Sequence, residues 1–458
     1  MSDERQILIR GGRVVNAEDV LRADVLIRGT RVEAVGLNLP VNPGVDVVDA
    51  GGLWVLPGVI DAHTHIQLDT GTYRTDDSWE IGSRAAALGG VTSVVDFATQ
   101  FEGQSFAEAL DARLQEAAPS WIDYGLHMMV TDVPPGEDAR LGALNNLGIQ
   151  SIKFYTTYRP FYYMDDAALL RLLRAAARYD LLTLIHCEND AMVTARTEAL
   201  VKAGHTSWRY HGEARPGLAE QEATARVLFL AREVGAPVVI AHNSTARTSR
   251  MVAAARARGQ VAYAETAPQY LLLDESRYDG EGPWRYILQP PLRSKTNCER
   301  LWELLSKGVM DMVITDHCDY TRAQKLETDD FTRTPGGLPG LETLLPLMVT
   351  YGVEKGRLDW PDLVRLLAYN PARIYGLWPR KGGLRPGADA DVVLYDPKPE
   401  SVLTDENIHM RAGYTPYQGM RIQGKVVTTI RRGSFLVRDS EWIEPEERGV
   451  FLRRSGVG

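Results

Sequence analysis

Two histidines separated by one residue, His63 and His65, follow an apolar segment of the chain and could bind a metal ion. The apolar run 53–56 leads through Pro57-Gly58 into 59–61, a pattern typical of a buried strand. Residues two apart on a strand point to the same face, so both imidazoles can face one point. A His-x-His pair is more often structural than metal-binding, so the prediction depends on which other side chains lie nearby.

Further polar side chains occur within or directly after later apolar runs. A polar residue after a strand is usually a turn or capping residue, but several of them at equivalent places favour a shared site. They are Lys153 within 151–154, His186 after 182–185, His242 after 238–241, and Asp316 and His317 after 312–315.

Short apolar runs alternate with Ala-, Leu- and Arg-rich segments of helical period across the middle of the chain. Asp165 is the expected N-cap of the helix at 166–174, and Gly235 the C-cap of the helix at 220–233. Eight such units over roughly 300 residues predict a (β/α)8 TIM barrel, whose active site lies where the strands end. The eight expected strands are 59–61, 93–97, 124–130, 151–154, 182–185, 238–241, 261–264 and 312–315.

The two ends of the chain read as short strands with tight turns. Hairpins are expected at Gly11-Gly12, at Gly29-Thr30 and at residues 431–433. Neither end has enough strands for a stable sheet alone, so we expect both termini to form one small β-sandwich domain. The predicted organisation is 1–57 plus 384–440 for this domain, 58–383 for the barrel and 441–458 for a tail, which is either an intersubunit arm or a frayed end.

Composition excludes several classes of protein. The 458 residues are 44% hydrophobic and 24% charged, with a formal charge of −9 and no basic stripe, which argues against nucleic acid as a partner. No apolar run is long enough to span a membrane, and the polar start 1–5 does not indicate a signal peptide. The three cysteines fit a reducing cytoplasm better than a disulfide framework.

Four histidines and one aspartate exceed the needs of one zinc ion, which takes about four ligands. They suit two metals roughly 3.5–4 Å apart, with an additional bridging anion. No Glu is expected at a suitable strand end, which leaves Lys153. Burial near cations would lower its pKa, and the free amine could add carbon dioxide to form a bridging carbamate. A lysine that reaches the barrel rim or pairs with an acid is the alternative.

These residues resemble the amidohydrolase superfamily and, within it, the cyclic amidohydrolases such as dihydropyrimidinase and D-hydantoinase. The resemblance covers nearly the whole chain and includes Lys153, His186, His242 and 315–317. Its other motifs are PGVIDAHTH (57–65), SRAAALGGVTSVVDF (83–97), PPLR (290–293) and LPGLET (338–343).

The resemblance implies two divalent metals, expected to be zinc. His63, His65 and Asp316 would bind the more buried metal, His186 and His242 the more exposed one, and carboxylated Lys153 would bridge them. Tyr158, five residues after the lysine, would stabilise the oxyanion, and Asp316 would also act as general base and acid. The implied reaction opens a cyclic ureide or imide to an N-carbamoyl amino acid in a homotetramer.

The chain departs from the family pattern around the substrate ring. Hydantoinases usually carry Ser at the position of Gln289 and Asn at that of Gly336 (or Gly337). These differences leave undecided which substrate ring the protein prefers.

The lid positions of the family correspond here to an apolar and aromatic wall, which favours an unsubstituted, alkyl or aryl ring over dihydroorotate. Arg74 and Arg159 are the nearby arginines. The wall positions are Leu68, Thr70, Tyr155 and Tyr162.

Several alternatives stay open. An allantoinase or dihydroorotase-like enzyme would keep the same centre. A non-enzymatic relative, such as the collapsin-response proteins, lacks metal ligands that this chain keeps. Superfamily deaminases use one metal and do not need the lysine. The remaining histidines are interpreted as core or surface residues, His317 as a neighbour of the ligands, and Cys187 and Cys318 as core residues facing away from the site.

Overall fold

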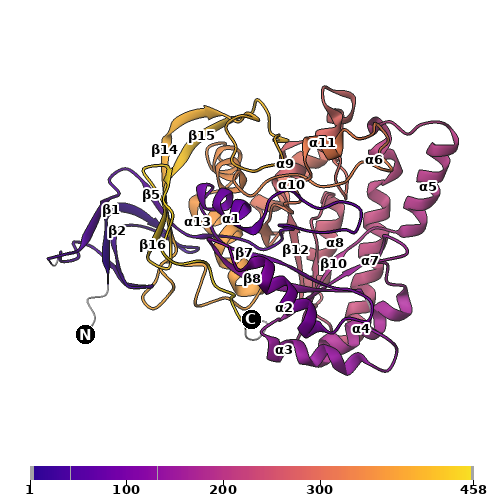
Figure 1. The fold of residues 1–458 in the computed structure, drawn as a ribbon, viewed down its shortest axis with the longest axis horizontal. Helices are drawn as coiled ribbons and strands as arrows, with labels where there is room; N and C mark the ends of the chain where they lie inside the picture. The colour runs from indigo at the N-terminus through magenta and orange to yellow at the C-terminus, as the bar shows by residue number, and fades with distance from the viewer. Residues whose placement is uncertain (1–4, 42, 132, 455–458) are drawn as a thin grey trace.

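The computed structural model describes residues 5–41, 43–131 and 133–454. A β-sheet domain built from an N-terminal and a C-terminal segment of the chain lies beside a larger α/β barrel (Figure 1). The expectations for residues 1–4 and 455–458 lie outside the described residues. Within the described residues, every helix is too short or too polar to cross a membrane.

The barrel wall is an eight-stranded parallel sheet in sequence order within the described residues, as the alternation of apolar runs predicts. The first and last strands are joined beyond their ends. There the Asp316 amide donates to the His63 carbonyl at 3.0 Å, and the His65 amide to the His317 carbonyl at 2.7 Å. The strands are β6 (Val59–Asp61), β7 (Val91–Gln100), β8 (Asp123–Val130), β9 (Ser151–Tyr155), β10 (Leu182–His186), β11 (Val238–Ile240), β12 (Ala262–Thr266) and β13 (Met312–Val313).

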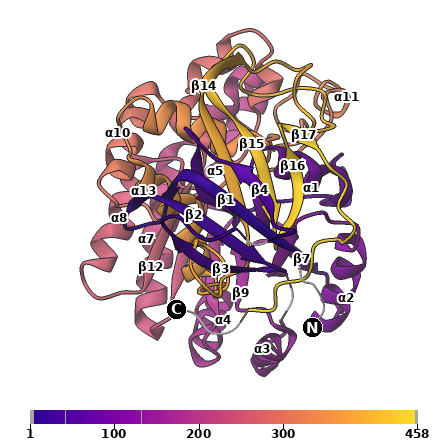
Figure 2. The ribbon, with the colours of Figure 1, turned by 90° about the vertical axis from the view of Figure 1, so that its left-hand side faces the viewer.

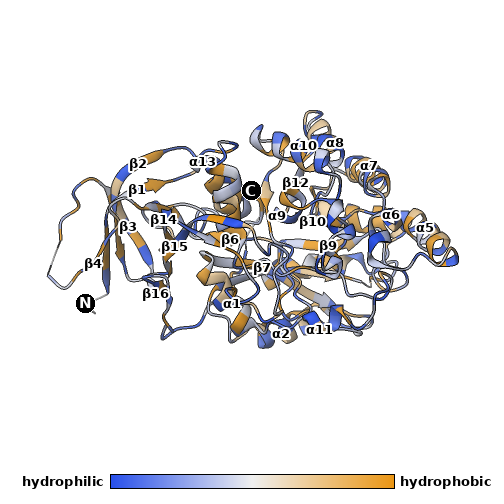
Figure 3. Ribbon diagram, turned by 90° about the horizontal axis from the view of Figure 1, so that it is seen from above, coloured by the Kyte–Doolittle hydropathy of each residue, from blue (hydrophilic) through white to orange (hydrophobic). Residues whose placement is uncertain are grey.

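Amphipathic helices cover the outside of this barrel. The expected caps are confirmed: the Asp165 side chain accepts from the amide of Ala168, and Gly235 adopts φ 73° at the end of α7. Helices such as α7 carry both hydrophobic and hydrophilic residues (Figure 3). The helices are α1 (Trp79–Leu88), α2 (Phe106–Ala117), α3 (Ala143–Leu147), α4 (Asp166–Arg178), α5 (Asp190–Lys202), α6 (His211–Ala214), α7 (Gly217–Val234), α8 (Ala246–Arg256), α9 (Pro268–Leu272), α10 (Lys295–Ser306), α11 (Arg322–Lys325), α12 (Leu344–Met348), α13 (Trp360–Val364) and α14 (Asn370–Ile374).

As predicted, both termini contribute to one β domain; where a β-sandwich was expected, the described strands form a single mixed sheet, and they lie together in Figure 2. The two ends of the chain join where β5 pairs antiparallel with β14, with Val55 opposite Leu394. The strands are β1 (Gln6–Val15), β2 (Val20–Arg28), β3 (Arg31–Gly36), β4 (Asp46–Asp49), β5 (Trp54–Pro57), β14 (Val392–Val402), β15 (Arg421–Arg431), β16 (Ser434–Arg438) and β17 (Glu441–Trp442).

The hairpin expected at Gly11-Gly12 is wrong. Strand β1 runs through both glycines, and its register with β2 shifts there. Gly11 has φ 74°, and its amide donates to the Asp24 side chain at 2.8 Å, so the pair forms a bulge within one strand. A Cβ on Gly12 would lie 2.3 Å from Val55, so close packing also requires glycine there. The hairpins at Gly29-Thr30 and 431–433 are confirmed.

The described part of the C-terminal tail is not frayed. After β17 the chain returns to the barrel, where the amide of Tyr124 donates to Val450 at 3.0 Å and that of Leu452 to Tyr124 at 2.7 Å. Leu452 is fully buried and Arg454 nearly so. The tail therefore extends hydrogen bonding from the edge of β8 and packs on its own barrel.

Candidate metal centre

Three predicted ligands meet where β6 and β13 end. The Nε2 atoms of His63 and His65 lie 3.3 and 3.4 Å from Asp316 Oδ1. One ligand atom from each residue lies within 4.8 Å of the others, so a single cation could contact all three. Burial lowers the pKa of His63 well below its usual value, which keeps its imidazole neutral and able to donate a lone pair.

A second pair of imidazoles faces the same barrel mouth. His186 Nδ1 lies 3.0 Å from His242 Nε2, and burial lowers the pKa of both residues. His186 Nε2 contacts the Glu188 carboxylate at 2.8 Å. Although burial opposes it, Arg215 holds the pKa of Glu188 below its usual value, so this carboxylate is charged. It can therefore accept a hydrogen bond from the Nε2 hydrogen of His186, which leaves Nδ1 free to bind a metal.

Lys153 lies between these two groups. Its side chain is almost fully buried, and Nζ is 3.4 Å from His63 Nε2. Burial lowers its pKa to about 8, so about a tenth of the amine is uncharged at pH 7, far more than for an ordinary lysine. The alternative of a lysine that reaches the solvent at the barrel rim is therefore wrong, and the free amine required for carbamate formation is available.

A buried glutamate that sequence reasoning missed completes the centre. Glu265 Oε1 lies 2.5 Å from His63 Nδ1 and accepts from the His242 amide at 3.2 Å. The expectation that no Glu stands at a suitable strand end is wrong, because β12 ends at Thr266 and not at residue 264. Burial raises the pKa of Glu265 to about 8, against the opposing charge of Lys153. Glu265 thus touches one histidine of each pair.

The cavity above these residues has a volume of about 390 Å³. The predicted wall is present, since Leu68, Thr70, Tyr155 and Tyr162 all line it, together with Gln289 and Gly336. Cys318 also lines the cavity, so its assignment to the core away from the site is wrong. Cys187 is buried outside the cavity lining, as expected.

Tyr158 lines the cavity beside His186, with ring centroids 5.0 Å apart. Burial raises the pKa of its phenol, which therefore stays protonated and able to donate a hydrogen bond. Its backbone has φ 74°, and His242 and Asp316 also have positive φ. Such conformations are costly for residues with a side chain and persist where the surroundings fix them, often at functional sites.

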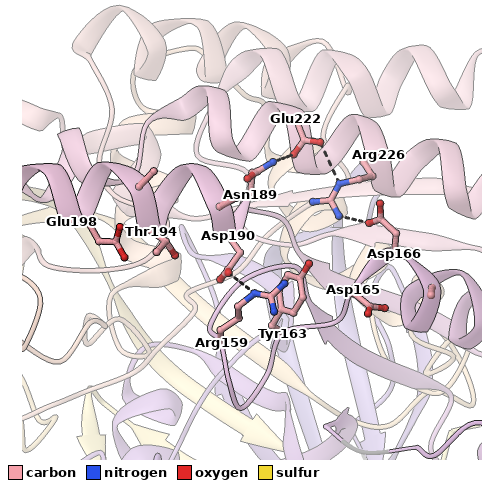
Figure 4. Close-up of a pocket in the computed structure, with 13 residues that line it drawn as sticks. Arg159, Tyr163, Asp165, Asp166, Asn189, Asp190, Thr194, Glu198, Glu222 and Arg226 are labelled. Atoms are coloured by element: carbon pink, nitrogen blue, oxygen red, sulfur yellow. Dashed lines mark hydrogen bonds and ion pairs between the residues drawn. The ribbon is translucent and has the colours of Figure 1, made fainter.

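The loop that carries Tyr158 is fixed to helix α5 by contacts that line a neighbouring pocket (Figure 4). Arg159 Nε donates to Asp190 at 2.9 Å, and its guanidinium stacks on Tyr163. The Thr157 hydroxyl donates to the same aspartate at 3.2 Å. Asp190 therefore holds both neighbours of Tyr158, which explains how a left-handed tyrosine keeps its position.

His317 is a buried neighbour of the ligands, as expected. Its ring lies 3.3 Å from Asp319 and 3.7 Å from Asp77, and its Nδ1 accepts from the Gly340 amide at 3.2 Å. These contacts fix the backbone next to Asp316. Among the described residues, the His317 ring makes no hydrogen bond or ion pair with any of the predicted metal ligands.

The donor set fits divalent cations. Four imidazoles, a carboxylate and a buried amine converge on one mouth, and the carboxyl groups of Glu188 and Glu265 lie behind two of the imidazoles. Carboxylates in this position fix the tautomer and orientation of metal-binding histidines. The arrangement is suited to metal-assisted hydrolysis rather than to nucleophilic catalysis by a side chain.

Comparisons with known proteins agree with this geometry. The model of the amidohydrolase family matches residues 54–436, and the chain belongs to this family. The chain is 38% identical over 454 residues, 98% of each chain, to a D-phenylhydantoinase of Escherichia coli (strain K12 / DH10B).

Solved structures show the same fold over the full length. Dihydropyrimidinase from Brevibacillus agri NCHU1002 matches with a TM-score of 0.96 and 35% identity over 99% of each chain. A D-hydantoinase from a Bacillus sp. AR9 matches with a TM-score of 0.95 and 38% identity, over 98% of this chain and 99% of its own.

Proposed function

We propose that this protein is a binuclear metal-dependent hydrolase that opens the ring of dihydropyrimidines or 5-substituted hydantoins to give N-carbamoyl amino acids. The observation that carries the proposal is the convergence of two histidine pairs, Lys153 and Asp316 beneath one cavity. The similarity to D-phenylhydantoinase and dihydropyrimidinase supports the choice of substrate class.

The proposed ligands divide into two groups. His63, His65 and Asp316 would hold one metal, His186 and His242 the other, and Lys153, carboxylated by carbon dioxide, would bridge them. When bound, two divalent cations, which we propose to be zinc, would supply the Lewis acidity that activates water and polarises a carbonyl group. The short distances within each group and the lowered pKa of Lys153 support this division.

The side chains then have separate tasks. Tyr158 donates its phenolic hydrogen to the oxygen that becomes negative when the ring carbonyl is attacked. Asp316 accepts the proton of the attacking water and returns it to the leaving ring nitrogen. A ring that fills the cavity beside its apolar wall would displace water, which would strengthen both interactions.

The cavity wall favours an apolar ring substituent. Among the described residues that line it, the one guanidinium, Arg159, is ion-paired with Asp190. An anionic substituent such as that of dihydroorotate would therefore find no unpaired arginine. Leu68, Tyr155 and Tyr162 would contact the substituent, and Gln289 and Gly336 the ring.

Ring-opening assays on zinc-loaded, bicarbonate-treated protein test the proposal. The panel is dihydrouracil, 5-phenylhydantoin, allantoin and dihydroorotate. Turnover of either of the first two is the expected result. If only allantoin or dihydroorotate is opened, the proposed substrate class is wrong but the protein is still a metal-dependent hydrolase. If none of the four rings is opened, the proposed function is refuted.

We also propose a cytoplasmic homotetramer without nucleic-acid or membrane partners. Three buried free cysteines and the negative net charge support the compartment and the absence of nucleic acid. The tetramer rests on resemblance alone, and sedimentation analysis tests it. The domain limits 1–57 plus 384–440, 58–383 and 441–458 stay a prediction that limited proteolysis can test.

A further inference from the structure

Glycine is required at position 336 because a larger residue would overlap a neighbouring side chain, and not because of its backbone conformation. Its φ lies outside the left-handed region, so any residue could adopt its backbone. A Cβ built on it would lie 1.8 Å from Gln289 Oε1 and 2.4 Å from Gln289 Nε2. The space beside Gly336 is therefore filled by the amide of Gln289.

The Gln289 amide faces the cavity without a partner. Gln289 is partly buried, and both it and Gly336 line the cavity that contains Asp316. Among the described residues, its side-chain amide makes no hydrogen bond. An amide offers one acceptor oxygen and two donor hydrogens. These groups are thus available to a ligand in the cavity.

The backbone that carries Gln289 is held on both sides. The Ile287 carbonyl accepts from Lys325 Nζ at 2.8 Å and from the Gly337 amide at 3.0 Å. His211 lies 2.7 Å from the Leu288 carbonyl, and the Tyr270 hydroxyl donates to the Pro290 carbonyl at 2.8 Å. The backbone that presents the Gln289 amide is therefore fixed, so binding has to order only the side chain.

The segment around Gly336 is tied to the metal ligands in turn. The Cys318 amide donates to the Leu338 carbonyl at 3.0 Å, and His317 forms a bridge with Leu338. These contacts, with the Gly337–Ile287 hydrogen bond, connect the Gln289 and Gly336 segments to the backbone next to Asp316.

We propose that Gln289 and Gly336 form one specificity-determining unit, in which glycine makes room for a side-chain amide that reads the amide edge of the substrate ring. The inference rests on the proposed function, since it names the contact that selects the ring. An endocyclic C(=O)–NH unit is complementary to a carboxamide. Nε2 would donate to the ring carbonyl, and Oε1 would accept from the ring N–H.

The unit makes the two positions dependent on each other. A side chain at position 336 would displace the Gln289 amide, because the far end of a flexible side chain can move aside while the backbone stays in place. The amide contact should then be lost even though Gln289 is still present. Independent residues would instead show additive effects.

The test is a double-mutant cycle of Gln289→Ala, Gly336→Ala and the double variant. The substrates are 5-phenylhydantoin and dihydrouracil, and metal content is measured for each variant. Each single change should raise KM about tenfold, the usual effect of losing one neutral hydrogen-bonded group, with little change in kcat. The double variant should be no worse than either single variant. Losses that multiply, or a Gly336→Ala enzyme with wild-type kinetics, would overturn the proposal.

The Gln289→Met variant distinguishes hydrogen bonding by the amide from the volume that the side chain fills, because methionine has a similar length but no amide. A raised KM supports the amide contact, and wild-type KM contradicts it. Gln221→Met and Gly280→Ala, both outside the cavity lining, are matched controls for the two types of substitution. If the wild-type enzyme opens none of the rings although it holds metal, the proposed function itself fails. If it opens them and the cycle is additive, only this inference fails.

Discussion

Replacement of Glu265 by Gln should weaken metal binding while the fold stays intact. Glu265 and His63 are both fully buried, and their side chains approach to 2.5 Å. Burial raises the pKa of Glu265 to about 8, so its carboxylate carries a charge above that pH or beside a bound cation. Glutamine keeps the shape and one acceptor but can never carry this charge, which stabilises a proton on His63 Nδ1. Loss of such a supporting carboxylate typically lowers metal affinity about 10–100-fold. That range corresponds to roughly 1.4–2.7 kcal/mol of binding free energy.

The assay is competition for zinc between the protein and a chromophoric chelator, with metal content measured on the same samples. Because Glu265 also accepts from the His242 amide at 3.2 Å, we expect the affinity of both metals to fall. The His63 contact is shorter than the His242 contact, so the metal held by His63 should be lost first. Activity at saturating zinc should recover in part, since the ligands themselves are unchanged.

Glu220→Gln is the matched control. Glu220 is also buried, but it accepts from the Thr245 amide at 3.1 Å and from Ser244, away from the ligand atoms. This variant should lower stability and leave zinc affinity unchanged. Equal zinc affinity in Glu265→Gln and the wild type would refute the reasoning, as would an equal loss in both variants.

Three further predictions concern the lysines and the tail. Lys153→Ala should abolish activity and lose both metals, and full metal content with a wild-type rate would contradict the carbamate. Burial lowers the folded-state pKa of Lys325 to about 7, against 10.5 ordinarily, so the unfolded chain binds more protons between these values. The free energy of unfolding should therefore rise with pH across this window. Urea unfolding of Lys325→Met, measured at the lower and the upper pH of the window, should show a smaller rise than the wild type. Deletion of 449–458 should lower the thermal midpoint, because Leu452 is fully buried, and an unchanged midpoint would show that the tail does not stabilise the barrel.

The barrel and most of the site follow from local signals in the sequence. His186 and His242 each stand directly after an apolar run, and such runs are the strands of the barrel. Because parallel strands of a barrel end at one face, these local signals are sufficient to bring distant residues together. The side-chain contacts of Asp316 with both His63 and His65 agree with that expectation.

Glu265 was missed because a strand boundary depends on a distant partner. Its run was expected to end at residue 264, yet β12 continues because Glu265 pairs with Met312 and Thr266 with Val313. The local sequence contains no information about this pairing. The bulge at Gly11 has the same cause, since its register is set by β2 and by the Asp24 side chain.

The two histidine pairs are built on a common plan that only the structure reveals. In each pair, one imidazole has its outer nitrogen held by a buried carboxylate: Glu265 for His63 and Glu188 for His186. The Nδ1 atoms of their partners, His65 and His242, are buried and make no hydrogen bond among the described residues. One histidine of each pair is thus fixed in tautomer and orientation by a carboxylate, while no described side chain fixes its partner through Nδ1. The proposed centre of two cations and a carbamate bridge would benefit from this combination, because fixed ligands set the position and ligands without that constraint can adapt to small differences in geometry.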